Sequence, residues 1–163
     1  SIIKTEHFAR FLLCYNLGMK FGLKSTIKHK KDDRFKIVKA EKGSGFGLIT
    51  KVPFKKGDFI IEYIGEKRLN KDIENHTGKY LFEIDETYTI DGSPRWNTAR
   101  YINHSCRPNC EVEIDKNDKI LVQAIKNIKE GEEITYDYGK EYFNEFIKPI
   151  GCKCTKCINK KNK

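Results

Sequence analysis

Short apolar stretches separated by turn residues dominate the chain from residue 34 onward. FKIVKA (35–40), FGLIT (46–50) and FIIEYIG (59–65) either alternate apolar and polar residues or run apolar between glycine, lysine and aspartate. Such stretches are typical of half-buried β-strands joined by tight turns. On the same grounds we expect strands at 80–84, 88–92, 110–114, 119–125 and 132–138.

Helical periodicity is scarce by comparison. Thr5 precedes a stretch in which Phe8, Phe11, Leu12 and Tyr15 share one helical face, so a short helix is expected near the start. Short helices are also expected at 67–76, 97–102 and 141–146. The pattern therefore predicts a mainly β domain of small sheets with few short helices.

Glycines at 43, 45 and 47 in KGSGFGL raise the question of nucleotide binding. A dinucleotide-binding fingerprint lies between a strand and a long helix, whereas here a second strand follows the glycines. A Rossmann fold is therefore excluded. Two interpretations stay open: a plain tight turn, or a turn at which the backbone approaches a ligand closely, as glycine permits.

The composition is that of a globular protein. The 163 residues, of which 38% are hydrophobic and 12% aromatic, suffice for one domain with its own core. No apolar run is long enough to span a bilayer. The apolar patch at 11–13 has no small-residue cleavage site after it, so we predict no secretory signal peptide and no membrane contact.

Charge is distributed unevenly along the chain. Residues 1–39 carry ten Lys/Arg against three acids, residues 148–163 carry six lysines and no acid, and residues 40–147 carry sixteen bases against twenty acids. Basic ends around an acidic centre are typical of polyanion contact at the ends and a cationic ligand at the centre. Simple solvation of basic tails explains the ends equally well.

Six cysteines without a secretory signal indicate a reducing compartment, where clustered cysteines more often bind metal than form disulfides. Cys152, Cys154 and Cys157 lie within GCKCTKC. A closed zinc site usually has four ligands, so these three thiols require a fourth from elsewhere in the chain. The disulfide alternative requires a distant partner for each of the three.

RYINHSCRPNC (100–110) is the most informative stretch, because Asn103 to Cys106 place an amide, an imidazole, a hydroxyl and a thiol side by side. Taken alone, these residues are compatible with an ordinary polar turn. However, the glycine turn (43–47), EYIGE (62–66) and YLFEID (80–85) precede them, and GEEITYDYG (131–139) and the cysteine cluster follow. In this order of motifs the chain resembles, over roughly residues 34–157, the SET-domain protein-lysine methyltransferases with a short post-SET zinc motif.

The resemblance implies a fold of small curled β-sheets, the β-clip, around a pseudoknot in which the YDY segment threads past NHSC. The resemblance implies a SET domain at 34–146 and a post-SET zinc motif with a basic tail at 147–163, while periodicity and charge predict a helical and basic extension at 1–33. The last cysteines are spaced CxCxxC, whereas post-SET motifs commonly have CxCxxxxC, and no cysteine-rich region lies between residue 1 and residue 34. Because flanking regions often select the substrate, its identity stays open.

The resemblance also implies the ligand-binding residues. The methyl donor, S-adenosylmethionine, is expected at the backbone of the glycine turn, at NHSC and between two of the clustered cysteines. The residues are Ser44, Gly45, Phe46, Tyr80, Asn103, His104 and Lys153. The fourth zinc ligand is expected to be Cys106, which would join Cys152, Cys154 and Cys157 around one Zn²⁺ ion.

The chemistry of lysine methylation requires a neutral amine. At a pKa near 10.4 only about one lysine in a thousand is neutral at about pH 7.4. A narrow aromatic channel excludes water, positions the amine and tolerates the cationic product. The resemblance implies that Tyr63, Tyr136 and Tyr138 line this channel, with Tyr138 as the catalytic tyrosine and Tyr136 limiting methylation to one or two methyl groups.

The sequence therefore predicts an S-adenosylmethionine-dependent protein-lysine N-methyltransferase of a basic protein, first of all a histone. Four acids and no Lys or Arg between residues 80 and 94 suit a lysine-bearing basic peptide, and the basic ends suit nucleosomal DNA. We expect a monomer at chromatin in the nucleus, or in the host nucleus for a microbial or viral enzyme, with the cytoplasm as the alternative. The alternative functions are methylation of a non-histone protein, an inactive SET-like module that binds peptide or nucleic acid, and a zinc-containing nucleic-acid-binding module.

Overall fold

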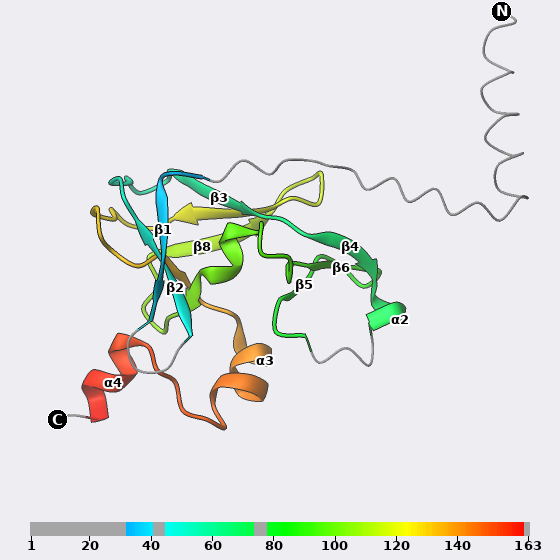
Figure 1. Ribbon diagram of the computed structural model, residues 1–163. Coiled ribbons are helices and arrows are strands. Elements are labelled where there is room, and N and C mark those ends of the chain that lie inside the picture. Colours follow the sequence, from blue (N-terminus) through cyan, green and yellow to red (C-terminus); the bar gives the residue numbers. More distant parts are fainter. Residues whose placement is uncertain (1–31, 41–44, 74–77, 162–163) are drawn as a thin grey trace, which may run out of the picture.

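The structure, a computed structural model, describes residues 32–40, 45–73 and 78–161. The helix expected near the start, and most of the 1–33 extension, lie outside the described residues. The described chain is mainly β, built from small sheets as predicted (Figure 1). None of its helices combines the length and the apolar character that a bilayer crossing requires.

Four sheets make up the fold, and three of them are antiparallel. The first pairs β1 (Phe35–Lys39) with β2 (Phe46–Thr50). The second has the order β3 (Phe59–Tyr63), β9 (Ile120–Ala124), β8 (Cys110–Ile114), and the third has the order β4 (Glu66–Leu69), β6 (Tyr88–Asp91), β5 (Leu81–Glu83). The fourth pairs two very short strands, β7 (Asn103–His104) and β10 (Thr135–Tyr136), in parallel.

The core lies between β2, the β3–β9–β8 sheet and the loops that close over them. Alternate residues of β9 are buried, which is why the sequence alternates there. Aliphatic side chains at most 1% exposed form the centre of the core: Leu48, Ile60, Ile102, Ile120, Val122, Ile128 and Ile134. Ile102 directly precedes the NHSC motif, so the core fixes the start of that motif.

The helix expected at 67–76 is wrong over its first part. Residues 66–69 form β4, which pairs with β6 in the register Glu66↔Asp91 to Leu69↔Tyr88, and the helix α2 covers only Asn70–Ile73. The side chains of EKRL are polar and favour a helix, which is why the strand was not predicted. Its backbone hydrogen bonds come from pairing with β6, and local propensity carries no information about that pairing. Within the stretch expected at 132–138, only Thr135–Tyr136 pairs as a strand.

The β7–β10 pairing brings the two signature segments together. Besides the strand pairing, the Ser105 N–H donates to the Tyr136 carbonyl at 3.0 Å. The buried Asn109 amide donates to the Glu133 carbonyl at 2.8 Å and accepts from the Thr135 N–H at 2.8 Å. This parallel contact between distant segments is the one that the expected pseudoknot requires.

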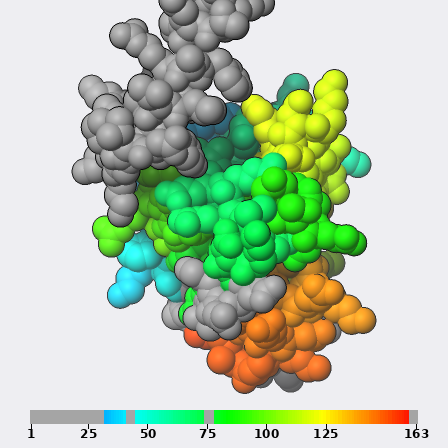
Figure 2. All heavy atoms as spheres, turned by 90° about the vertical axis from the view of Figure 1, so that its right-hand side faces the viewer, coloured from blue at the N-terminus to red at the C-terminus, as the bar shows by residue number. Residues whose placement is uncertain are grey.

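Short helices complete the C-terminal part. The 3₁₀ helix η2 (Thr98–Tyr101) lies within the expected 97–102, and α3 (Lys140–Tyr142) continues into a π-helical turn, η3 (Phe143–Ile147), where 141–146 was expected. The helix α4 (Thr155–Lys161), inside the cysteine-rich end, was not expected. Figure 2 shows the green β4–β6–β5 region above the orange α3–η3 segment on one face of the molecule.

Candidate active site

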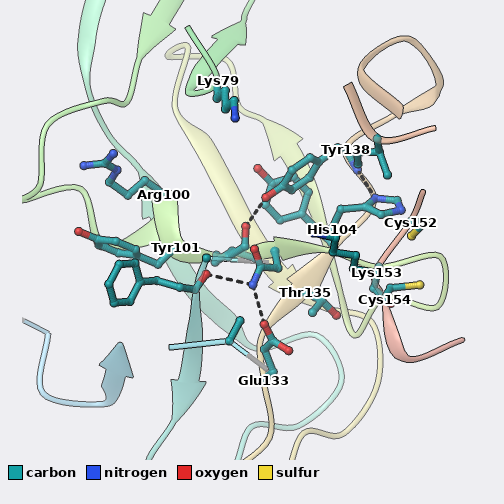
Figure 3. A pocket seen from close by; sticks show the side chains of 18 of the residues that line it. Lys79, Arg100, Tyr101, His104, Glu133, Thr135, Tyr138, Cys152, Lys153 and Cys154 are labelled. Atoms are coloured by element: carbon teal, nitrogen blue, oxygen red, sulfur yellow. Dashed lines mark hydrogen bonds between the residues drawn. The ribbon is translucent and has the colours of Figure 1, made fainter. Parts of the chain in front are cut away.

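A cavity of about 990 Å³ opens between the β1–β2 sheet, the β7–β10 pair and the C-terminal helical segments. Of the residues predicted for donor and lysine binding, those that line it are Gly45, Phe46, Tyr63, Tyr80, Asn103, His104, Tyr136, Tyr138 and Lys153. Ser44 lies outside the described residues. Figure 3 shows Arg100 and Tyr101 on one side of this cavity and His104, Lys153 and Cys154 on the other. The predicted residues therefore share one cavity although up to 108 positions separate them.

Three of the predicted tyrosines, Tyr63, Tyr136 and Tyr138, line the cavity close to one another. The rings of Tyr136 and Tyr138 are 5.0 Å apart, the Tyr138 hydroxyl donates to the Ile102 carbonyl at 2.6 Å, and the Tyr63 hydroxyl donates to the Tyr80 carbonyl at 2.8 Å. Burial raises the pKa values of Tyr63, Tyr136 and Tyr138, and the neighbouring tyrosines raise them further. All three phenols are therefore neutral at physiological pH.

Tyr142 is a cavity residue that sequence reasoning missed. It lies on α3, its ring meets that of Tyr138 edge-on at 5.1 Å, and its hydroxyl donates to the Lys79 carbonyl at 3.4 Å. Phe146 stacks obliquely on it at 4.7 Å. The spacing of Tyr138, Tyr142 and Phe146, four residues apart, is a signal for one helical face that could have identified it. We call Tyr63, Tyr136, Tyr138 and Tyr142 the tyrosine cluster.

The Asn103 side chain joins the glycine turn to the segment before β10. Its amide donates to the Phe46 carbonyl at 3.0 Å and to a Glu133 carboxylate oxygen at 2.8 Å (Figure 3). A Cβ on Gly47 would collide with this carboxylate, and Gly45 has a left-handed φ of +78°. The glycines are therefore required by the turn itself and by contacts within the chain, and Glu133 is a second residue that the sequence reasoning missed.

His104 connects the tyrosine cluster to the cysteines. Its Nδ1 accepts a hydrogen bond from the Tyr138 backbone N–H at 3.3 Å, and its Nε2 lies 3.4 Å from the Cys106 sulfur. Burial lowers the pKa of His104, while Asp137, with a carboxylate oxygen 3.5 Å away, opposes this shift. The ring is therefore neutral, and because Nδ1 accepts, the ring proton lies on Nε2 and points at sulfur.

Four cysteines lie together as predicted, beside this histidine. The sulfurs of Cys106, Cys152, Cys154 and Cys157 all lie within 4.8 Å of one another, and the group could hold a metal ion. The Cys106 sulfur is 3.8 Å from that of Cys152 and 3.7 Å from that of Cys157. Four thiolates at about 2.3 Å from a tetrahedral Zn²⁺ would be about 3.8 Å apart, so the donor set and its spacing fit zinc. None of the four forms a disulfide. We call them the cysteine clip.

Arg100 also lines the cavity and was missed. Its guanidinium lies over the ring of Tyr80 at 4.0 Å and over that of Tyr101 at 5.3 Å. Its Nε is buried and has no hydrogen-bond partner within the described residues. A buried donor without a partner beside two aromatic rings fits a bound group with a carboxylate and a flat base, as S-adenosylmethionine has. Its position next to the NHSC motif was the available signal.

The acidic stretch lies on the β5–β6 hairpin. Glu83, Asp85 and Glu86 are exposed and Asp91 is partly buried. Asp85 accepts hydrogen bonds from the backbone N–H groups of Thr87 and Tyr88, and Asp91 accepts one from Ser93, so two of the four acids also stabilise turns. None of the four acids lines the cavity, although Tyr80, Leu81 and Phe82 from the start of the same hairpin do.

Comparison with known families identifies the same segments. The model of the SET domain matches residues 45–139. Among curated proteins, the histone-lysine N-methyltransferase ash1 of Drosophila melanogaster is 35% identical over 125 residues, 69% of this chain and 6% of its own length. The Arabidopsis thaliana histone-lysine N-methyltransferase ASHH3 is 37% identical over 133 residues (74% and 36%), and human histone-lysine N-methyltransferase 2D is 38% identical over 121 residues (68% and 2%).

Among solved structures, a humanized mutant of Chaetomium thermophilum Polycomb Repressive Complex 2 bound to the inhibitor GSK126 resembles this fold. Its TM-score is 0.59 at 32% sequence identity, over 64% of this chain and 15% of that chain. The chain spans 36% or less of the length of the three curated relatives named above. The similarity therefore concerns the domain that contains the cavity.

Proposed function

The chain belongs to the SET-domain family, and from this membership we propose that it is a protein-lysine N-methyltransferase that uses S-adenosylmethionine and acts on a histone. The observation that carries the proposal is the meeting of NHSC, YDY and the glycine turn around one cavity lined by neutral tyrosines. The relatives' names supply the substrate class.

We assign donor binding to Gly45, Phe46, Tyr80, Asn103, His104 and Lys153, as predicted, with Ser44 outside the described residues, and we add Arg100. When bound, S-adenosylmethionine supplies an electrophilic methyl group on a sulfonium sulfur. Arg100 offers its unpaired Nε to an anionic group, and the exposed ring of Phe46, held edge-on by Tyr101 at 6.2 Å, offers an apolar surface. Asn103 holds the backbone of Phe46 in place through its amide.

Tyr138 is the proposed catalytic residue, and it acts by orientation. Its hydroxyl hydrogen is committed to the Ile102 carbonyl, so its oxygen is left to accept a hydrogen bond from the substrate amine. A phenol whose pKa is raised by burial is a poor ionised base, so the lysine proton must leave to solvent. The rings of the tyrosine cluster exclude water around the amine and stabilise the cationic product.

Tyr136 is proposed to limit the number of methyl groups. It is 8% exposed, lies against Tyr138, and its hydroxyl occupies space that successive methyl groups would need. In Tyr136→Phe that hydroxyl is removed, and we expect mass spectrometry of the product to show a shift towards more methyl groups per lysine.

The cysteine clip is proposed to hold one structural zinc ion, with Cys106 as the fourth ligand. His104 donates its Nε2 proton towards the Cys106 sulfur, which stabilises a thiolate there. We further propose that the acidic β5–β6 hairpin attracts a basic peptide, that the basic ends contact nucleosomal DNA, and that the protein acts as a monomer at chromatin in the nucleus.

An inactive SET-like binding module is the second candidate. The presence of Tyr138, Asn103 and His104 in one cavity, with the Tyr138 N–H bonded to His104, favours an enzyme. A zinc-containing nucleic-acid-binding module would account for the clip and the charge but leaves the tyrosine cluster without a role.

Transfer of labelled methyl groups tests the proposal. The protein is incubated with labelled S-adenosylmethionine and either core histones or nucleosomes, beside Tyr138→Phe and the matched control Tyr88→Phe. Tyr88 lies outside the cavity, beneath the Lys67 ammonium at 4.1 Å. We expect lysine labelling by wild type and control, and a loss of about 100-fold or more in Tyr138→Phe. No labelling by wild type would contradict the methyltransferase proposal, and equal labelling by Tyr138→Phe would remove its catalytic role.

A further inference from the structure

A second cavity shares no lining residue with the candidate active site. Its volume is about 460 Å³, and its lining residues are Asp32, Phe35, Lys36, Ile37, Lys51, Arg95, Trp96 and Thr98. β1 and η2 contribute to both cavities: Ile37 and Thr98 line this one, whereas Val38 and Arg100 line the donor cavity. Ile37 and Val38 are consecutive strand residues whose side chains point to opposite faces, so the two cavities open on opposite sides of β1. Neither the SET-domain match nor the predicted site residues assign a role to the second.

Positive charge dominates the second cavity. Lys36, Lys51 and Arg95 are exposed, and none of the three forms a salt bridge within the described part of the chain. The acid in the lining, Asp32, pairs with Arg34 through contacts of 2.7 and 3.0 Å, and this pairing lowers its pKa. Asp32 is therefore already neutralised, and the three cations are left to attract an anion.

Apolar surface lies among these cations. Trp96 is 39% exposed and Ile37 is 40% exposed, two of the few large apolar side chains that face solvent in the described chain. The neighbouring Asn97, by contrast, is fully buried and donates to the Gly92 carbonyl at 3.1 Å, so the backbone that carries Arg95 and Trp96 is held firmly. Cations together with an exposed aromatic ring on a fixed backbone suit a ligand with repeated anionic groups and apolar faces between them.

We propose that this surface, the basic groove formed by Lys36, Lys51, Arg95 and Trp96, binds the phosphate backbone of double-stranded DNA. Successive phosphates can pair with several flexible cations at once, and the sugar between them can pack on the indole ring. A DNA duplex also carries negative charge at a higher and more regular density than an acidic protein segment, which favours it as the occupant of a groove with three cations that form no salt bridge within the described residues. The groove would act in addition to the basic ends of the chain, and it would hold the enzyme on the DNA that surrounds a nucleosomal substrate.

DNA binding can be measured without the donor, so the test is independent of the proposed methyltransferase activity. A fluorescent 30-base-pair duplex of mixed sequence is titrated with the full chain at several salt concentrations. The groove variant carries Lys36→Gln, Lys51→Gln and Arg95→Gln. The matched control carries Lys56→Gln, Lys116→Gln and Lys129→Gln, three exposed cations that line neither cavity and change the net charge equally.

The expected result is a difference in salt dependence. Each phosphate contact contributes about 0.9 to the slope of log affinity against log salt, so loss of three contacts should flatten the slope by roughly 2.7 in the groove variant. The control should flatten it by less than about one. Trp96→Leu should weaken binding with little change in slope, because it removes ring contact and no charge.

Nucleosomes supply a second measurement. The groove variant should methylate nucleosomes several-fold more slowly than wild type does. It should methylate free core histones at the wild-type rate, because none of its three substitutions lies in the donor cavity. Equal slopes for the groove variant and the control, or binding of polyglutamate as tight as that of the duplex, would overturn the proposal. The first outcome would assign DNA binding to the chain ends, and the second would assign the groove to an acidic protein.

Discussion

At the scale of single residues, the hydroxyl of Tyr138 is suited to orient a bound group and not to act as an acid or a base. Its hydrogen is fixed on the Ile102 carbonyl, and burial followed by the nearby Tyr136 and Tyr142 keeps its pKa well above the usual value. The same causes act on Tyr63 and Tyr136. Ring position and hydrogen-bond direction, rather than ionisation, are therefore what these residues contribute.

The raised tyrosine pKa values predict a loss of stability in alkali. In the unfolded chain tyrosine ionises near pH 10, whereas in the folded chain Tyr63, Tyr136 and Tyr138 resist ionisation. Their contribution to stability is therefore complete below about pH 10 and is lost as the pH rises towards the folded pKa values. Each such tyrosine should cost roughly 1.4 kcal/mol per pH unit in that window.

Denaturant unfolding at about pH 9, 10 and 11 measures this loss, and Tyr63→Phe should reduce its slope. Tyr88→Phe, outside the cluster, serves as the control and should leave the slope as in wild type. A stability that is constant across this window would contradict the burial of the cluster.

Where a motif carried the information, the structure brings the predicted residues into one cavity or cluster, while their roles stay predictions. The residues of NHSC and YDY, and the cysteines, could be placed from their order in the chain. Glu133, Arg100 and Tyr142 were missed because their roles depend on partners far away: the Asn103 amide, the Tyr80 ring and the Lys79 carbonyl. A single charged or aromatic residue beside a motif does not reveal such a partner.

At the scale of elements, the sequence predicted those strands whose own side chains alternate. β1, β2, β8 and β9 were found at or close to their bounds. β4 was mistaken for helix and β7 was not expected, because their backbone hydrogen bonds come from strands distant in sequence. A strand of two residues is too short to show an alternation of apolar and polar side chains.

Gly92, directly after β6, lies tightly against Tyr63 of the tyrosine cluster. A Cβ at this position would overlap the ring and hydroxyl of Tyr63. We expect Gly92→Ala to displace Tyr63, to lower the free energy of unfolding by about 1–3 kcal/mol and to slow methyl transfer. Ser93→Ala, the exposed neighbour, should stay within about 0.5 kcal/mol of wild type.

Chemical denaturation and the labelling assay measure both effects. Gly92→Ala with wild-type stability and rate would show that Tyr63 can move at no cost, and that its position is not set by β6.

At the scale of the whole molecule, the cysteine clip joins the middle of the chain to its C-terminal segment. Cys106 follows β7, Cys152 and Cys154 lie in the segment before α4, and Cys157 lies within α4. Ile147, Ile150 and Ile158 line the donor cavity together with the glycine turn, so the predicted post-SET segment forms part of the cavity wall. Metal binding by the four cysteines would therefore also fix this part of the cavity wall in place.

Removal of the metal should open the cavity. A zinc chelator, or Cys106→Ser, is expected to release one zinc ion per chain and to weaken binding of S-adenosylhomocysteine, as measured by calorimetry. If the zinc site contributes about 3 kcal/mol to the free energy of unfolding, its loss should lower the midpoint of thermal unfolding by roughly 6–12 °C.

Cys110→Ala is the control, because Cys110 is fully buried in β8 and stands apart from the clip. It should keep the zinc. Full metal content in Cys106→Ser, or unchanged ligand affinity after chelation, would contradict the role of the clip.

The parallel β7–β10 contact has a consequence for the order in which the protein is made. NHSC leaves the ribosome well before YDY and the last cysteine, so a growing chain carries half of its donor site with nothing to complete it. A shortened product that ends before residue 135 would lack the strand that pairs with β7, and one that ends before residue 157 would lack a member of the cysteine clip. Under the proposed function, each such product would carry an incomplete donor site.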